Sequence, residues 1–145
     1  MKKVWILIGL VIMMIFIIIF LSYNQEKTEV CFEENCFLVE LAKTDVEKER
    51  GLIFRKSLEN NRGMLFIFNE EGGYNFWMKN TLITLDIIWI NSEKEVVYIE
   101  HRAEPCSETC ESITPGVNSQ FVLEINGDIA KKLNINIGDL ARFEI

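Results

Sequence analysis

Histidine is scarce in this sequence, and several familiar catalytic motifs are missing. His101 is the only histidine among 145 residues, so a serine–histidine pair or a multi-histidine metal site would depend on it alone. It lies between Glu100 and Arg102 at an expected strand end, and we interpret it as a solvated surface residue. No nucleophile elbow, His-Glu-x-x-His zinc motif, phosphate-binding glycine loop or dinucleotide fingerprint occurs. The sequence therefore predicts neither a metal nor a cofactor.

Charge is missing from residues 4–21, which are apolar apart from one glycine. At about 1.5 Å per residue, a helix of this length reaches roughly 27 Å, close to the thickness of a hydrocarbon core. Phe20, Leu21 and Tyr23 are bulky, whereas a cleaved signal peptide ends in small residues. We therefore predict an uncleaved anchor over residues 1–21 that contacts the membrane through its apolar run. A cleaved signal or a buried soluble helix remains an alternative.

Basic residues on either side of the apolar run predict its orientation. Lys2 and Lys3 precede it, whereas Lys27 is the single basic residue in the dozen that follow. Positive charge stays on the cytoplasmic side, so we expect a single-pass protein of the cell membrane with a cytoplasmic N-terminus and an extracytoplasmic C-terminal domain. Residues 22–29 form a short stem in this interpretation, and residues 30–145 form the exported domain.

The exported part is strongly acidic. Without Lys2 and Lys3 it carries 13 basic against 22 acidic residues, a formal net charge of −9. Binding to nucleic acid requires basic patches that neutralise phosphates, so nucleic acid is excluded as an expected partner, and anionic lipid headgroups are disfavoured on the same ground. The charge does not identify a ligand or a protein partner.

The four cysteines form two local pairs, Cys31 with Cys36 and Cys106 with Cys110. In an oxidising compartment such pairs are typical of disulfides, and each short loop closed in this way is worth only about 2 kcal/mol on the chain-entropy model. A four-cysteine zinc site is an alternative, although neither spacing is the common two-residue one. Free or crossed cysteines are a further alternative.

Short alternating apolar runs separated by turn residues predict a domain built mainly of strands. Thr44 and Glu47 form a capping box that begins a short helix, and Gly51 ends it. A second short helix is expected around residues 129–133. The expected strands are 30–32, 37–42, 64–68, 74–78, 85–90, 96–99, 120–125 and 140–145. The predicted fold class is mostly β (α+β), a compact barrel-like or sandwich domain with two short helices, preceded by one N-terminal transmembrane helix.

Several runs resemble a known family. They are Gly51-Leu52-Ile53-Phe54-Arg55, Gly63-Met64-Leu65-Phe66-Ile67-Phe68, Phe76-Trp77-Met78-Lys79-Asn80-Thr81 and Leu85-Asp86, followed in the same order by Val122-Leu123-Glu124, Gly127 and Gly138-Asp139. Together they resemble domain-of-unknown-function family 192 over roughly Val30 to Ile145. The resemblance implies a small β-rich domain, often exported in prokaryotes, with no established activity. Ile53 departs from the usual methionine of the family, which is a swap between apolar side chains of similar size.

Asp86 and Glu124 are the carboxylates that deserve a test. Both alternate with apolar residues on expected strands, so each is expected to be at least partly buried. Asp86 would then need a cation, from Arg55 or Lys79, or backbone N–H groups, and a stabilising pair is the favoured interpretation. The functional alternative is a cleft carboxylate with a perturbed pKa. If the two carboxylates converge in a groove, acid–base hydrolysis of a polymer becomes conceivable.

Trp77, Asn80 and Thr81 are close in sequence and combine an indole with polar groups, as in sites where a ring stacks on a ligand. Core packing of Trp77 is nevertheless the favoured interpretation, since aromatic residues in small domains mainly serve the core.

These observations favour a membrane-tethered binding or accessory module without catalysis. Its candidate ligand site comprises Arg55, Trp77, Asn80, Thr81, Asp86 and Glu124. One alternative is an envelope hydrolase that uses Asp86 and Glu124 on an extracytoplasmic polymer. Another is a structural interaction protein, for which an exposed apolar patch is expected instead of a polar groove.

Overall fold

The computed structural model of the chain describes residues 10–15 and 27–145. Residues 10–15 are helical, and their apolar side chains are about half exposed. Apart from this helical turn, the anchor predicted over residues 1–21 lies outside the described residues. Within the described ranges, no helix has the length and apolar composition needed to cross a bilayer. The anchor therefore stays a prediction.

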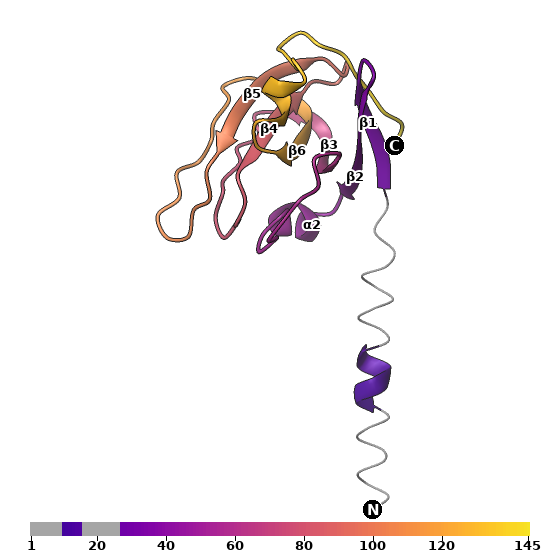
Figure 1. Cartoon of the computed structure of the whole chain (residues 1–145), viewed down its shortest axis with the longest axis vertical. Coiled ribbons are helices and arrows are strands. Elements are labelled where there is room, and N and C mark those ends of the chain that lie inside the picture. Colours follow the sequence, from indigo (N-terminus) through magenta and orange to yellow (C-terminus); the bar gives the residue numbers. More distant parts are fainter. Residues whose placement is uncertain (1–9, 16–26) are drawn as a thin grey trace, which may run out of the picture.

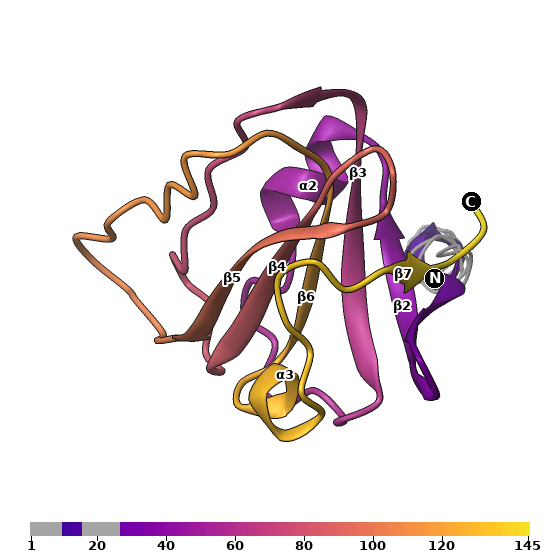
Figure 2. The same cartoon turned by 90° about the horizontal axis from the view of Figure 1, so that it is seen from above.

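Seven strands form a curled sheet, a half-barrel, in the spatial order β5-β4-β6-β3-β2-β1-β7 (Figures 1 and 2). Neighbouring strands are antiparallel except β2 and β3, which are parallel. The predicted mostly β fold with short helices is confirmed in this coarser form. The strands are β1 (Lys27–Phe32), β2 (Asn35–Ala42), β3 (Arg62–Gly72), β4 (Leu85–Ile90), β5 (Val96–Ala103), β6 (Ser119–Asn126) and β7 (Ala141–Arg142).

The first hairpin is held by a disulfide directly across its two strands. Cys31 and Cys36 face each other in the register of β1 and β2, with Cα atoms 4.0 Å apart. The second predicted disulfide, Cys106–Cys110, is also formed. Lys27 pairs with Glu40, so β1 begins inside the segment predicted as a stem. Hydrogen-bonded pairing with β2 explains the longer strand, because alternating side chains alone do not reveal where a partner strand ends.

Helix α2 (Asp45–Arg50) begins and ends where the sequence predicts. The hydroxyl of Thr44 accepts a hydrogen bond from the Glu47 N–H, and the Glu47 carboxylate accepts one from the Thr44 N–H at 2.8 Å. This capping box satisfies backbone donors that a helix start leaves unpaired. Gly51 then turns the chain with a φ of 44°. Figure 1 places α2 at the end of the sheet where β1 begins.

The two faces of the sheet carry separate apolar clusters. One packs against α3 (Ile129–Lys132), and we term it the α3-side core. The other packs against the chain that follows α2, and we term it the α2-side core. Buried members of the α3-side core include Val30, Phe37, Val39, Leu65, Ile88, Leu123 and Ile125; those of the α2-side core include Leu52, Met64, Phe66, Met78, Ile87, Trp89 and Val122. Successive residues of β6 therefore enter different cores.

The segment from Gly138 to Arg142 connects the two outer parts of the sheet. The Gly138 N–H donates to the Val96 carbonyl (2.9 Å), and the Ala141 N–H donates to the Lys94 carbonyl (2.8 Å). The same segment provides β7, which pairs with the end of β1. Backbone groups that would be unpaired at both edges thus find partners in one short stretch of chain.

Two expected strands differ in the structure. Residues 74–78 form an isolated bridge, Phe76 to Ile113, instead of a strand. The final strand is reduced to Ala141–Arg142. Both segments pack over the sheet and therefore have apolar residues at some alternate positions. The same sequence pattern is typical of a paired strand, so the sequence alone does not distinguish the two.

Removing residues 138–145 should lower the free energy of unfolding by at least about 4 kcal/mol, because the loss of a buried phenylalanine such as Phe143 alone costs about 3–5 kcal/mol. Urea unfolding followed by near-ultraviolet circular dichroism measures the effect. Removal of Ile145 alone, an exposed residue, is the matched control and should change stability by less than about 0.5 kcal/mol. Equal stability of the two shortened chains would contradict the bridging role of the segment.

Candidate functional site

The Asp86 carboxylate is fully buried and accepts three backbone hydrogen bonds. Its Oδ1 accepts from the N–H groups of Arg102 (2.9 Å) and Asp128 (3.2 Å), and its Oδ2 accepts from the Ala130 N–H (2.8 Å). Arg102 and Asp128 both have positive φ, so the carboxylate stabilises two turns that are otherwise unfavourable for these residue types. Of the partners expected from the sequence, backbone N–H groups are present instead of a cation.

Glu124 is buried without such partners. Its side chain is 95% hidden by the residues described, and Oε2 has no hydrogen-bond partner among them. Burial raises the pKa of the Glu124 carboxyl from its ordinary value of 4.5 to about 8. The carboxyl is therefore protonated at neutral pH and has an O–H to donate.

A small pocket lies over Glu124. It has a volume of about 30 Å³, enough for a water molecule or two. Thr81 and Trp77 line it together with Gly51 and Leu52, which follow α2. Three of the residues predicted from the sequence, Trp77, Thr81 and Glu124, are thus brought together.

The structure does not bring Asp86 and Glu124 together. Asp86 pairs across the sheet with Ile125, and Ile87 pairs with Glu124. Cross-strand partners share a face and successive residues alternate, so the two carboxylates project from opposite faces of the sheet. The carboxylate pair that the hydrolase interpretation requires is not formed.

Arg55 has a different carboxylate partner from the one expected. Its guanidinium makes two hydrogen bonds to Glu40, at 2.9 and 2.7 Å, in a side-by-side arrangement. Glu40 lies on β2, and its neighbour on β3 is Met64, which in turn pairs with Glu124. Arg55 therefore fixes the loop after α2 to β2, which is separated from the strand of Glu124 by β3. It neutralises Glu40 instead of Asp86.

Trp77 is 53% exposed, so the favoured interpretation as a core residue is wrong. The neighbouring Phe76 takes that place, with edge-on ring contacts to Phe66 (4.9 Å between centroids) and Trp89 (5.6 Å). The Lys79 ammonium lies 5.3 Å from the centre of the Trp77 ring. Alternation along the segment explains the result, because only one of two adjacent aromatic residues can face the core.

Asn80 and Thr81 are positioned through their backbones. The Asn80 carbonyl accepts from the Phe54 N–H (2.9 Å), and its N–H donates to the Cys106 carbonyl (2.7 Å). Asn80 has a φ of 59°, a conformation that asparagine tolerates better than most residues. This turn places the buried side chain of Thr81 in the pocket lining. Asn80 therefore acts as a support for the pocket.

A larger cleft of about 220 Å³ adjoins the Glu124 pocket, and we term it the aromatic cleft. Phe68 and Tyr74 stack at one side of it, with ring centroids 3.5 Å apart. Sequence reasoning missed this cleft, although the aromatic residues on both sides of the Gly72-Gly73 turn were a usable signal. The cleft is lined by Lys48, Glu49, Phe66, Phe68, Tyr74, Asn75, Phe76 and Trp77; Lys48, Glu49, Phe66, Phe76 and Trp77 also line the Glu124 pocket.

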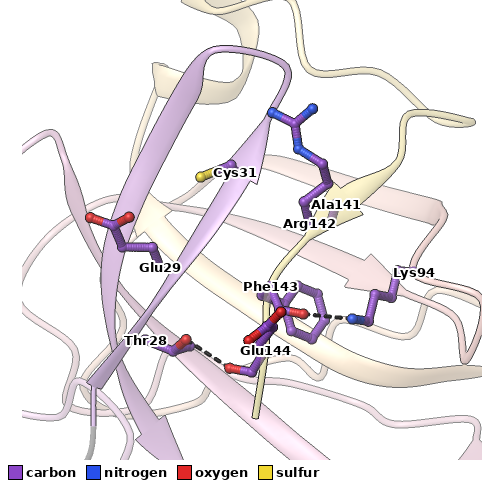
Figure 3. A pocket seen from close by; sticks show the side chains of 8 residues that line it. All are labelled: Thr28, Glu29, Cys31, Lys94, Ala141, Arg142, Phe143 and Glu144. Atoms are coloured by element: carbon purple, nitrogen blue, oxygen red, sulfur yellow. Dashed lines mark hydrogen bonds between the residues drawn. The ribbon is translucent and has the colours of Figure 1, made fainter.

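An open groove of about 580 Å³ between β1 and β7 is larger, and two of its polar side chains are already paired with backbone carbonyls (Figure 3). The Thr28 hydroxyl donates to the Glu144 carbonyl (2.8 Å), and the Lys94 ammonium donates to the Phe143 carbonyl. Glu29 lies beside the first disulfide with its oxygen within 4.8 Å of both sulfur atoms. Disulfide sulfur lacks the thiolate charge that binds a metal, so this group is not a metal site in the oxidised protein.

Comparisons with known proteins identify the fold and a family. The family model of domain-of-unknown-function family 192, described as "Uncharacterized ACR", matches residues 28–143. A protein of unknown function from Novosphingobium aromaticivorans DSM 12444 is 36% identical, with a TM-score of 0.71 over 81% of this chain and 84% of that one. A Sinorhizobium meliloti 1021 protein, provisionally described as a transcription regulator, is 30% identical, with a TM-score of 0.73 over 83% and 94%. No curated protein matches the chain.

Asp86→Asn should lower the free energy of unfolding by about 3 kcal/mol, because hydrogen bonds to a charged group are worth about 1.5–3 kcal/mol each and an amide nitrogen cannot accept them. Urea unfolding at neutral pH measures the loss. Asp128→Asn is the matched control, since Asp128 is half exposed and forms a surface ion pair with Arg102. The control should cost less than about 1 kcal/mol. Equal losses in the two variants would contradict a structural role for Asp86.

The contribution of Glu124 to stability should fall as pH rises from about 4.5 to 8, because the unfolded Glu124 ionises in this range while the folded one stays protonated. At about 1.4 kcal/mol per pKa unit the total loss from this residue is roughly 5 kcal/mol. Glu124→Gln should lack this component. The free energy of unfolding of the variant should therefore rise relative to that of the parent as pH increases from about 4.5 to 8.

Urea unfolding of both proteins at a series of pH values provides the measurement. Glu111→Gln, at an exposed position, is the control and should show the pH dependence of the parent. A constant difference between Glu124→Gln and the parent over the whole range would show that the Glu124 pKa is not raised.

Proposed function

The chain belongs to domain-of-unknown-function family 192, and we propose that it is a membrane-anchored, extracytoplasmic binding module. Its ligand site is the Glu124 pocket together with the aromatic cleft. The buried Glu124 carboxyl carries the proposal, because one of its oxygens has no hydrogen-bond partner among residues 10–15 and 27–145, at a pocket that opens beside an exposed indole. Buried polar groups are almost always hydrogen-bonded, so a ligand that pairs with Glu124 gains binding free energy without displacing a protein partner.

Sequence and local structure support the anchored location. Residues 10–15 present only apolar side chains to the solvent, an arrangement that lipid would satisfy. Disulfides Cys31–Cys36 and Cys106–Cys110 suit an oxidising compartment outside the cytoplasm. In this proposal residues 1–21 form the transmembrane helix, the N-terminus is cytoplasmic, and the β domain lies outside.

The size and lining of the two adjoining cavities indicate which kind of ligand would fit. Protonated Glu124 donates a hydrogen bond, so the tip of the ligand is a neutral acceptor, such as an amide carbonyl or a hydroxyl, small enough for about 30 Å³. Thr81 at the same pocket adds a hydroxyl that can donate or accept. The body of the ligand is a ring that fills the aromatic cleft and lies against Trp77. Acetylated amino sugars combine these features.

The description of the Sinorhizobium meliloti relative as a regulator of transcription does not extend to this chain in our proposal. The exported part has a formal net charge of −9, which repels nucleic acid phosphates. The candidate site is also an aromatic cleft with a buried acid, a lining suited to a small neutral molecule.

N-acetylglucosamine should shift the amide resonances of Gly51 and Thr81 and the indole resonance of Trp77 in ¹H–¹⁵N spectra of the oxidised protein at neutral pH. Glu124→Gln should keep the binding, because its amide still donates a hydrogen bond, whereas Glu124→Leu should lose it. In the parent, binding should weaken as pH rises through about 8, where the Glu124 carboxyl loses its proton.

Asp128→Asn is a control at the opposite face and should bind like the parent. The proposed site is wrong if glucose-type sugars and neutral amides at millimolar concentration leave all three resonances in place. It is also wrong if Glu124→Leu, shown to be folded, binds as tightly as the parent.

One observation favours catalysis as a second candidate function. Glu49 lines the same pocket as the protonated Glu124. Glycoside hydrolysis uses two carboxyl groups that flank the scissile bond, one of which acts as an acid. Release of sugar from a chitin-type oligosaccharide, abolished by Glu49→Gln, would identify the domain as an enzyme. Binding without turnover identifies it as a binding module.

A further inference from the structure

Three exposed apolar side chains belong to the segments that line the Glu124 pocket and the aromatic cleft. Phe54 is 66% exposed, Trp77 53% and Val46 of α2 75%. The Phe54 N–H donates to the Asn80 carbonyl (2.9 Å), which joins the loop of Phe54 to that of Trp77. We term Val46, Phe54 and Trp77 the apolar rim. Large apolar side chains grouped on a surface mark a place of interaction.

Each ring of the apolar rim is followed two positions later by an exposed lysine, Lys56 after Phe54 and Lys79 after Trp77. The Lys79 ammonium lies over the Trp77 ring, 5.3 Å from its centre. A ring at the level of lipid headgroups, with a lysine whose stem reaches the phosphates, is the usual composition of a membrane interface. The acidic charge of the domain disfavours attachment by charge alone, so the rings must provide most of the contact.

The apolar rim lies at the end of the domain where β1 begins. Lys27 pairs with Glu40 in the register of β1 and β2, and Arg55 forms its ion pair with Glu40 at 2.7 Å. The loop of Phe54 is therefore fixed beside the first residue of β1. In Figure 1, α2 and the loops that follow β3 and α2 all lie at this end.

The chain between the apolar run and β1 is short. Six peptide steps separate Leu21 from Lys27, and at about 3.5 Å each they cover at most about 20 Å. A domain held so close to a bilayer has its β1 end within reach of the headgroups. Tethering keeps the local concentration of lipid high, so even weak insertion of two rings is effective.

We infer that the apolar rim rests in the interface of the membrane that holds the chain, with the Phe54 and Trp77 rings among the lipid headgroups. This inference depends on the anchor of the proposed function and is independent of the ligand at Glu124. The mouth of the aromatic cleft then lies next to the membrane surface.

Quenching by lipid tests the inference with the full chain in phosphatidylcholine/phosphatidylglycerol vesicles that contain lipid brominated near the headgroup. Trp5→Phe removes the indole of the apolar run, and fully buried Trp89 serves as an internal reference. Trp77 emission, obtained by difference from a variant that also carries Trp77→Phe, should decrease with brominated lipid.

Ile137→Trp in the variant that lacks Trp5 and Trp77 is the matched control, because Ile137 is 65% exposed and belongs to the segment between α3 and β7, which Figures 1 and 2 place over the opposite end of the domain. Its emission should not change. Equal quenching at positions 77 and 137, or none at 77, overturns the inference while the anchor stands. Release of the chain from vesicles by alkaline carbonate overturns the anchor and with it the inference.

Discussion

Three segments of the chain depend on one buried carboxylate, that of Asp86. The end of β5, the turn into α3 and the first turn of α3 each give it a backbone N–H. The end of β5 is far in sequence from the two segments at the start of α3, and Arg102 and Asp128 each have a positive φ that needs support from elsewhere in the chain. Asp86 also lies on β4, the strand between β5 and β6, so the helix is attached to the strand next to the β5 edge of the sheet. A carboxylate with three donors has its charge satisfied, which is why it serves architecture and leaves no capacity for a ligand.

Glu124, a buried acidic residue on the neighbouring strand β6, differs from Asp86 in its hydrogen bonding. It pairs with Ile87, one residue from Asp86, but projects into the α2-side core, where no backbone donor reaches Oε2 among the residues described. The raised pKa follows from burial alone. Perturbed groups of this kind are often found at functional sites, and in our proposal Glu124 binds a ligand in the adjoining cavities. The difference between the two carboxylates is the clearest argument for the site.

Much of the fold could be predicted because its signals are local. The first hairpin, the capping box at Thr44, the turn at Gly51 and the strand over 85–90 follow from neighbouring residues. The candidate site was only partly predictable, because it joins α2 to a loop thirty residues later through contacts that no local pattern encodes. Trp77 and Phe76 illustrate the limit: period-two alternation says that they face opposite ways, but only the sheet beneath decides which one is buried.

The bridging segment from Gly138 to Arg142 has a consequence for the way the domain is made. β1 precedes all the other strands and β7 follows them, yet β7 pairs with β1 and the same segment bonds the start of β5. As the chain is made, the first hairpin is complete early, and β1 keeps an open edge until about a hundred further residues have been added. Open edges pair readily with other chains. In the extracytoplasmic location that we propose, formation of the Cys31–Cys36 bond before the sheet is complete would hold this hairpin together and protect the nascent domain from aggregation.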